Sequence, residues 1–467
     1  MSIASPVGFS KTVVVQQNHV PDNDATESSG GTVPRSTDVV VVGAGVIGNS
    51  IAYELSARGY RVLVVDKEGG PGFGSTSASS AIIRFNYSTF DGMATAWESA
   101  QCWKNWPEHL GNSASTDLAR FHECGMVFLD VDLAPRERTV RLFDEIGVAY
   151  ELWDSTTLSD RVPGIDVGSY FPPKPVDSDA FYADAATSLG AVFTPQAGFV
   201  DDPRLAAANL GAAAASAGAR FTFRTRVVRI EQQVSERWIV HLDNGDTVEA
   251  PIVVNAAGPW SGALNAMAGV GSDFTVDVRP LRQEVHHVSA PEGYNQDARL
   301  GPMIADLDLG TYMRPERGGG LLIGGTEPEC DPLEWIDDPD SANPSRTAAR
   351  FQAQVTRAAR RLPRLSVPFQ PKGIAGVYDA ASDWTPIYDR TDRAGFYVAM
   401  GTSGNQFKNA PVVGRMLTTL IERVEAGHDH DVDPVVYTGT HTGVKVDLGS
   451  FSRRREFNTE STGTVLG

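Results

Sequence analysis

Short continuous runs of apolar residues mark the first strands of the chain. DVVVV, which begins at Asp38, and YRVLVVD, which ends at Asp66, are typical of strands buried on both faces of a parallel sheet. Between these runs, Ile51 and Leu55 lie one helical turn apart, and Gly59 supplies a stop signal. The pattern therefore predicts a strand–helix–strand unit near the start of the chain.

Periodic and alternating segments follow further along. In chain order we expect an alanine-rich helix (202–220), a strand (221–233), a hairpin turning at Asn244-Gly245, a buried strand ending at Gly258, antiparallel strands (279–325), an amphipathic helix (344–362), and a strand, glycine loop and long helix (395–427). Residues 116–195 are irregular and rich in proline, so no regular element is assigned there.

A glycine motif sits between the first strand and the first helix. Gly43, Gly45 and Gly48 form G-x-G-x-x-G, and Asp66 follows the second strand. Such glycines permit a tight turn and close approach of a pyrophosphate to the amides at the helix N-terminus. Asp66 is placed to accept hydrogen bonds from a ribose 2′-hydroxyl, which disfavours NADP because that position would carry a phosphate. In this context the motif predicts dinucleotide binding rather than a purely structural turn.

Three further stretches favour FAD over NAD. A Gly/Ser-rich loop (67–88) has hydroxyls and amides that suit a pyrophosphate and ribityl chain, and VVNAAGPW has small residues at a strand end. GTSGNQFKNAP leads into a helix, whose N-terminal amides suit the pyrimidine edge of a flavin.

These elements predict an α/β fold of two domains interleaved in sequence. A Rossmann-like cofactor domain is expected from 37–115, 196–275 and 370–430, and an inserted α+β substrate domain with an antiparallel sheet from 116–195 and 276–369. The remaining segments are a mostly disordered tail (1–36) and a C-terminal extension (431–467) with a loose end. Its basic SRRREF sequence is interpreted as solvated surface.

Charge and cysteine content remove several classes of function. The 467 residues carry 40 basic and 58 acidic side chains, a net charge of −18, which does not suit nucleic-acid binding. No apolar run reaches the ~18–20 residues that span a bilayer. Three separated cysteines favour a reducing compartment, so we expect a cytoplasmic protein. His428-x-His430 lacks a third ligand nearby and is interpreted as a solvated loop, so no metal site is expected.

The motifs, in this order, resemble those of the D-amino-acid oxidase superfamily, nearest its sarcosine oxidase and dimethylglycine dehydrogenase branch, over residues 38–425. The resemblance implies a glutathione-reductase-like FAD domain. The cofactor residues that it implies, together with those from the motifs above, are Gly43, Ala44, Gly45, Val46, Ile47, Gly48, Asp66, Lys67, Gly74, Ser75, Thr76, Ser80, Ile82, Val228, Ala257, Gly258, Trp260, Gly376, Gly404, Asn405, Gln406, Phe407 and Lys408.

The resemblance also implies a substrate site. Arg84, in SAIIR, matches an arginine that binds the substrate carboxylate, and Lys408, in GNQFK, matches the lysine of the same clamp. A structural ion pair is the alternative for either cation. Tyr378 and Tyr312 match positions near the substrate, with a core aromatic role as the alternative for each.

Two adjacent histidines complete the set of candidate catalytic residues. His286 and His287 lie on one predicted strand and point to opposite faces, so only one of them can face the flavin. A structural histidine is the alternative for each.

Departures from the family pattern change the expected chemistry. Positions that carry a flavin-linked cysteine or histidine in some members are Gly376 and Ala78 here, so noncovalent FAD is expected. The oxygen-activating lysine of monomeric sarcosine oxidases is replaced by Leu322, and a histidine expected shortly afterwards is Thr326. The electron acceptor, oxygen or another, therefore stays open.

Three functions remain. The first is oxidation of a carboxylate-bearing amine to an imine, which then hydrolyses. The second is dehydrogenation of a 2-hydroxyacid, which needs a base for the hydroxyl proton, and His286 and His287 are the candidates. The third is a non-catalytic FAD-binding scaffold. The exact substrate and the oligomeric state are not fixed by the sequence.

Overall fold

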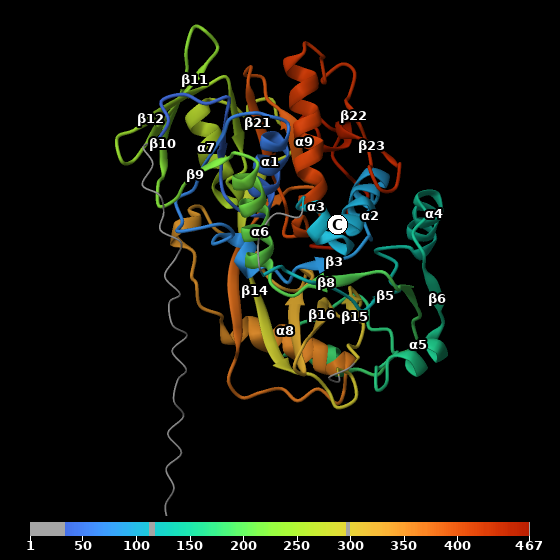
Figure 1. Ribbon diagram of the computed structural model, residues 1–467. Helices are drawn as coiled ribbons and strands as arrows, with labels where there is room; N and C mark the ends of the chain where they lie inside the picture. The colour runs from blue at the N-terminus through green and yellow to red at the C-terminus, as the bar shows by residue number, and fades with distance from the viewer. Residues whose placement is uncertain (1–32, 112–116, 296–298, 467) are drawn as a thin grey trace, which may run out of the picture.

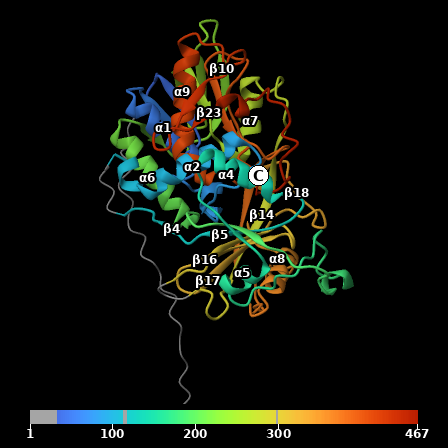
Figure 2. The same cartoon turned by 90° about the vertical axis from the view of Figure 1, so that its right-hand side faces the viewer.

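The computed structural model describes residues 33–111, 117–295 and 299–466. The predicted tail (1–36) therefore lies outside the described residues except for its last four positions. Figures 1 and 2 show an upper part, with a mainly parallel sheet and its helices, stacked on a lower part that is built on a large, mostly antiparallel sheet. The predicted fold class is confirmed.

The upper part is built on a six-stranded sheet. In spatial order its strands are β20 (Ile387–Arg390), β21 (Phe396–Met400), β13 (Ile252–Asn255), β1 (Val39–Val42), β2 (Val62–Val65) and β9 (Arg220–Thr222). All neighbours are parallel except β20 and β21. The four valines of β1 are buried, as their uninterrupted run predicts for a strand covered on both faces.

Different elements cover the two faces of this sheet. On one face lie the helices α1 (Val46–Ala57), α6 (Pro203–Ser216) and α9 (Ala410–Glu425). On the other lie α7 (Ser261–Ala268) and the antiparallel strands β10 (Val227–Gln232), β11 (Trp238–Leu242) and β12 (Thr247–Ala250). Val39 and Val41 belong to the core under the helices, and Val40 and Val42 to the core under the small sheet.

The lower part is built on a nine-stranded sheet. Its strands are, in spatial order, β18 (Glu334–Trp335), β14 (Val278–Ser289), β17 (Gly320–Gly325), β16 (Thr311–Glu316), β15 (Met303–Asp306), β5 (Met126–Leu129), β7 (Ala191–Thr194) and β6 (Glu151–Trp153), with β19 (Gly373–Ala381) also paired to β14. The helix α8 (Ala348–Arg361) covers this sheet and buries Phe351, Val355 and Ala358 against it.

This sheet draws on more of the chain than the sequence pattern indicated. The segment 116–195, predicted to be irregular, contributes β5, β6 and β7 and the helices α4 (Arg136–Ile146) and α5 (Ser155–Arg161). Its strands are only three or four residues long, too short to show a period between proline-rich loops. β19 comes from the range expected in the cofactor domain, yet it pairs along nine residues with β14.

The remaining elements are smaller. They are a sheet of β3 (Ile82–Ile83), β8 (Gly198–Val200) and β4 (Phe121–Glu123), the helices α2 (Phe90–Lys104) and α3 (Trp106–His109), the hairpin of β22 (Val436–Thr438) and β23 (Lys445–Asp447), and 3₁₀ turns at Ser75–Ala78, Asp179–Tyr182, Gly258–Trp260, Pro339–Ser341, Phe407–Asn409 and Leu448–Phe451. Among the helices of the described ranges, none is long and apolar enough to cross a membrane.

The C-terminal extension is anchored by a buried arginine, contrary to the expectation of a solvated basic patch. Arg453 is fully buried. Its guanidinium donates to Asp389 (3.1 Å), to Asp431 (2.7 Å) and to Asp273 (2.8 Å). The neighbouring Arg454 is half-exposed and contacts the same Asp273 and Asp431. The acidic partners lie far away in the sequence, so the basic run alone could not reveal them.

Two more residues near the end of the chain, Arg455 and His430, correct the sequence interpretation. Arg455 is buried, and its Nε and Nη2 donate to the two carboxylate oxygens of Asp383 at 3.0 and 2.8 Å. His430, expected in a solvated loop, is also buried, and its Nδ1 accepts a hydrogen bond from the Val435 amide. The predicted absence of a metal site stays a prediction, and within the described ranges no cluster of three His, Cys, Asp or Glu side chains is arranged to hold an ion.

We predict that Arg453→Ala lowers the free energy of unfolding by about 3–5 kcal/mol, because it leaves the buried Asp389 carboxylate without its cation. Arg454→Ala is the matched control, and it should cost less than about 1 kcal/mol since its side chain is half-exposed. Urea unfolding followed by circular dichroism measures both. Equal losses for the two variants would contradict a special role for Arg453.

Candidate active site

A long cavity lies at the carboxyl ends of β1, β2 and β13, where parallel sheets of this kind bind ligands. Most of the predicted site residues line it. They are Gly43, Gly45, Val46, Ile47, Asp66, Lys67, Gly74, Ser75, Thr76, Ser80, Ile82, Arg84, Ala257, Gly258, Trp260, Tyr312, Tyr378, Gly404, Asn405, Gln406, Phe407 and Lys408. The cavity thus brings together segments from the two ends and the middle of the chain.

Two of the three motif glycines leave no room for a side chain. Gly43 has φ +109°, and a Cβ there would lie 2.3 Å from the carbonyl oxygen of Ala256. A Cβ on Gly48 would lie 1.9 Å from the carbonyl oxygen of Gly43. Gly45 is different, because its Cβ would meet only the Thr76 hydroxyl, at 3.3 Å. Gly43 and Gly48 therefore allow close packing, while Gly45 leaves the N-terminus of α1 accessible to a ligand.

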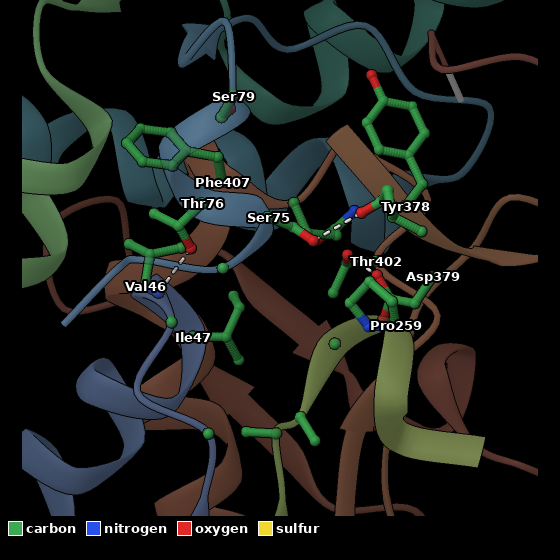
Figure 3. Close-up of a pocket in the computed structure, with 18 of the residues that line it drawn as sticks. Val46, Ile47, Ser75, Thr76, Ser79, Pro259, Tyr378, Asp379, Thr402 and Phe407 are labelled. Atoms are coloured by element: carbon green, nitrogen blue, oxygen red, sulfur yellow. Dashed lines mark hydrogen bonds between the residues drawn. The ribbon is translucent and has the colours of Figure 1, made fainter. Parts of the chain in front are cut away.

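The N-terminus of α1 and the Asp66 carboxylate suit the pyrophosphate and ribose of a dinucleotide. The Val46 amide donates to the Thr76 hydroxyl at 3.1 Å, so a hydroxyl already lies where the helix can bind an anion (Figure 3). Asp66 accepts hydrogen bonds from the amides of Ala44 (2.6 Å) and Glu68 (2.7 Å). These bonds fix the direction of a carboxylate that lines the cavity.

A lysine–tryptophan stack closes the end of the cavity beyond Asp66. The Lys67 ammonium lies 3.6 Å from the centre of the Trp260 ring and also pairs with Asp340. The Trp260 indole donates to the same carboxylate at 2.9 Å, and Arg226 donates to it as well. A flat ring and charged groups at this end suit the adenosine half of a dinucleotide.

The loop around Gly74 and Ser75 and the loop from Thr402 to Lys408 form the opposite end of the cavity. Figure 3 shows Ser75 and Tyr378 on facing elements and Thr402 beside Asp379. The Ser75 hydroxyl donates to the backbone carbonyl of Val377 at 2.6 Å, and Thr402 donates to Asp379. A Cβ on Gly404, which has φ +68°, would meet the Tyr378 ring at 2.2 Å, so this glycine lets the loop lie flat against the ring.

Two buried cations, Arg84 and Lys408, lie on this part of the cavity wall. Arg84 donates to the backbone carbonyls of Asn86 and Val465, the latter at 2.7 Å. Lys408 donates to the Tyr87 hydroxyl at 2.9 Å and to the Asn405 carbonyl. Burial lowers the pKa of both groups, and the charge of Arg84 lowers that of Lys408 further. Within the described ranges neither cation forms a salt bridge, so both favour an anionic ligand.

The two predicted tyrosines line the same cavity. Burial raises the pKa of Tyr312 to about 12 and raises that of Tyr378 well above its usual value, so both hydroxyls stay protonated at neutral pH. The Tyr312 hydroxyl is hydrogen-bonded to Ser80 at 2.8 Å. Both are therefore hydrogen-bond donors rather than bases.

Neither predicted histidine lines the cavity. His286 is buried edge-on against Phe351 of α8, and burial lowers its pKa to about 4. His287 is partly exposed and lies 3.0 Å from Glu316. The strand alternation separates the two as expected, but the lower sheet turns both away from the cavity. The base needed for hydroxyacid oxidation therefore does not come from either residue.

Four predicted cofactor residues also lie off the cavity wall. Ala44 and Gly48 contribute only to the tight turn, and Val228 is half-exposed, while its neighbour Val227 lines the cavity. An adjacent small cavity includes Gly376.

Sequence reasoning missed several residues that line the cavity. They are Met126, Arg226, Pro259, Asp379, Thr402, Val465 and Leu466. Pro259 and Thr402 stand inside the motifs quoted above and could have been included. Val465 and Leu466 carried no signal, because the extension reaches the cavity only through tertiary contacts.

Comparison with known proteins identifies the family. A model of the DAO family, described as FAD dependent oxidoreductase, matches residues 38–420. The chain belongs to this family. Glycine oxidase of Geobacillus kaustophilus is 28% identical over 84% of this chain and 94% of its own sequence. FAD-dependent oxidoreductase domain-containing protein 1 of Bos taurus is 27% identical over 88% of this chain and 86% of its own sequence. The crystal structure of the Geobacillus glycine oxidase covers 85% of this chain and 97% of its own, with a TM-score of 0.66 and 25% identity.

Membership makes the protein an FAD-dependent oxidoreductase, and the cavity fits that cofactor. The open turn at Gly45, the amides of α1 and the Asp66 carboxylate suit the pyrophosphate and ribose. The loop from Thr402 to Lys408 leaves space for the ring system next to the two cations. The predicted cofactor and the resemblance to the superfamily are confirmed.

We predict that Gly45→Ala weakens FAD binding at least tenfold, because the methyl group occupies the space that the pyrophosphate needs while only Thr76 must yield. Gly262→Ala in α7 is the control, since a Cβ there meets no atom within 4 Å. Titration of the apoprotein, followed by quenching of flavin fluorescence, measures both affinities. Equal FAD affinity in the two variants would contradict this placement of the pyrophosphate.

We also predict that acid precipitation releases all of the bound FAD into solution. The positions at which some relatives attach flavin are Gly376 and Ala78, which face each other closely, since a Cβ on Gly376 would lie 2.7 Å from that of Ala78. Cys102, Cys124 and Cys330 do not line the cavity. Absorbance of the supernatant measures the release, and yellow colour left in the washed pellet would show covalent attachment.

Proposed function

We propose that the protein oxidises the C–N bond of a carboxylate-bearing amine, either an α-amino acid or its N-alkyl derivative, to an imine that water then hydrolyses. One observation carries the proposal. Arg84 and Lys408 place two buried basic side chains on the wall of the FAD cavity, and the partners that the structure gives them are neutral. A substrate carboxylate would supply the missing anion.

The neighbouring groups favour binding and orientation over acid–base work. Arg84 presents a planar fork and Lys408 a point charge, so together they fix the position of a carboxylate and thereby that of the adjacent α-carbon. Tyr312 and Tyr378 remain protonated and form polar walls beside it. FAD, when bound, supplies the acceptor for the hydride equivalent that leaves this carbon. The loss of the nitrogen-bound proton completes the C=N bond.

The relatives support an amine substrate without fixing which one. The Geobacillus relative is a glycine oxidase, whose substrate has a carboxylate next to the carbon that is oxidised. The alternative, a 2-hydroxyacid dehydrogenase, loses its candidate bases because His286 and His287 lie off the cavity. A scaffold role is disfavoured because both cations line the FAD cavity. The electron acceptor, oxygen or another, and the cytoplasmic location inferred from three free cysteines stay predictions.

Anaerobic mixing with glycine, N-methylglycine, L-proline, D-alanine or lactate tests the proposal. We expect at least one of the amines to bleach the yellow absorbance of the flavin and lactate to leave it unchanged. Bleaching by lactate alone would contradict an amine substrate and support the hydroxyacid alternative. Retention of FAD with no bleaching by any of these compounds would support the scaffold.

We further expect Arg84→Gln to weaken the binding of acetate by about 2 kcal/mol, roughly 30-fold, because a charged hydrogen-bond donor is lost. Arg141→Gln, at an exposed position of the helix α4, is the control and should leave acetate affinity unchanged. Perturbation of the flavin spectrum by acetate gives both constants. An unchanged affinity in Arg84→Gln would show that this arginine does not hold the carboxylate.

A further inference from the structure

The backbone of Val465 is held at both ends by hydrogen bonds to side chains. Its amide donates to Oε2 of Glu327 at 2.7 Å, and its carbonyl accepts from Nη2 of Arg84 at 2.7 Å. Arg84 follows β3 and Glu327 follows β17, so the two side chains come from different sheets. Val465 itself is buried and lines the cavity wall.

The nitrogen, α-carbon and carbonyl carbon of one residue have the same connectivity as those of a free α-amino acid. A ligand that replaced Val465 would put its carboxylate on Arg84 and its amine on Glu327. We infer that Arg84 and Glu327 form a two-ended subsite for an α-amino acid, and that Val465 fills this subsite as an internal mimic which the substrate displaces. The inference rests on the proposed function, because Arg84 is the carboxylate-binding residue in both.

Glu327 is held ready for such a ligand. Its second oxygen accepts a hydrogen bond from the Gln283 amide at 3.0 Å, which fixes the carboxyl plane. Its backbone has φ +48°, a conformation that a side chain of this kind rarely adopts and that the surrounding fold must impose. Burial raises the pKa of Glu327 to about 8, so opposite an uncharged amide it is largely protonated at neutral pH. The ammonium group of an amino acid would stabilise its carboxylate form.

The tip of the extension can leave without unfolding its base. Arg453 and Arg455 hold the base through buried carboxylates. The stem from Glu456 to Gly463 is exposed or only partly buried, and its contacts include those of Asn458 with Ser88 and Thr385. Only Thr464, Val465 and Leu466 are buried at the tip. Release of the tip therefore exposes these three residues. It breaks the hydrogen bonds of the Val465 backbone to Glu327 and Arg84, which a bound amino acid would replace.

L-valine and 3-methylbutanoate test the subsite, because they share a carbon skeleton and differ only in the amino group. With FAD-loaded full-length protein, we expect Glu327→Gln to weaken L-valine binding at least tenfold and 3-methylbutanoate binding less than twofold. Glu329→Gln, an exposed neighbour, should change neither. Flavin difference spectra give the constants, and an equal loss for both compounds in Glu327→Gln would overturn the subsite.

Displacement of the tip is tested by Val465→Pro, which removes the amide that donates to Glu327. We expect both compounds to bind about tenfold more tightly, while Val234→Pro, at an exposed turn, has no effect. In the unaltered protein, saturating L-valine should increase hydrogen–deuterium exchange over residues 460–466. Unchanged exchange at saturation, or no binding of either compound to the Val465→Pro protein, would overturn the mimic.

The outcomes separate this inference from the proposed function. If an amine bleaches the flavin but Glu327→Gln affects both compounds equally, the subsite is wrong and the amine oxidation stands. If no amine bleaches the flavin but L-valine binding depends on Glu327 and releases the tip, the subsite stands and the proposed oxidation is wrong.

Discussion

Two buried basic side chains, with no carboxylate partner in the described part of the chain, determine what the rest of the cavity must provide. Arg84 and Lys408 are removed from water by packing, and a buried charge is costly unless other groups replace its hydration. The fold supplies backbone carbonyls of Asn86, Asn405 and Val465 and the Tyr87 hydroxyl, all of them neutral. This partial compensation leaves a positive potential at one end of the FAD cavity. The same potential favours a carboxylate ligand. It also favours the contact between Arg84 and the carbonyl of Val465, which is distant in the sequence.

The net negative charge of the protein and the basic side chains inside the cavity both affect how a carboxylate ligand binds. The net charge of −18 gives a carboxylate no long-range attraction, so its capture depends on local cations. The acids have a structural use instead. Asp273, Asp389 and Asp431 surround Arg453, and Asp383 holds Arg455, so the C-terminal extension is fixed by ion pairs at its base. Aspartates bind the base of the extension outside the cavity, and Arg84 binds the backbone of its tip inside the cavity.

The sequence predicted those parts of the site that depend on local patterns. The strand before Gly43, the glycine spacing and Asp66 specify a turn within a few residues, and GNQFK placed Lys408 beside Arg84 through the family resemblance. Residues positioned by distant contacts were not predictable. The four-residue strand β5 shows no period of its own and forms only because β15 and β7 lie beside it. His286 was misplaced because strand alternation gives two faces but not which one the helix α8 covers. Val465 had no pattern at all.

The central sheet of the upper part has a consequence for the order in which the protein matures. β1 pairs with β13, and β13 pairs with β21, so the neighbouring strands come from residues near 40, 250 and 400. The Ala256 carbonyl that closes over Gly43 arrives more than two hundred residues after it, and Lys408 later still. During synthesis the chain therefore carries its nucleotide motif long before it has a nucleotide site. A chain can therefore bind FAD only after synthesis has passed Lys408 and reached α9.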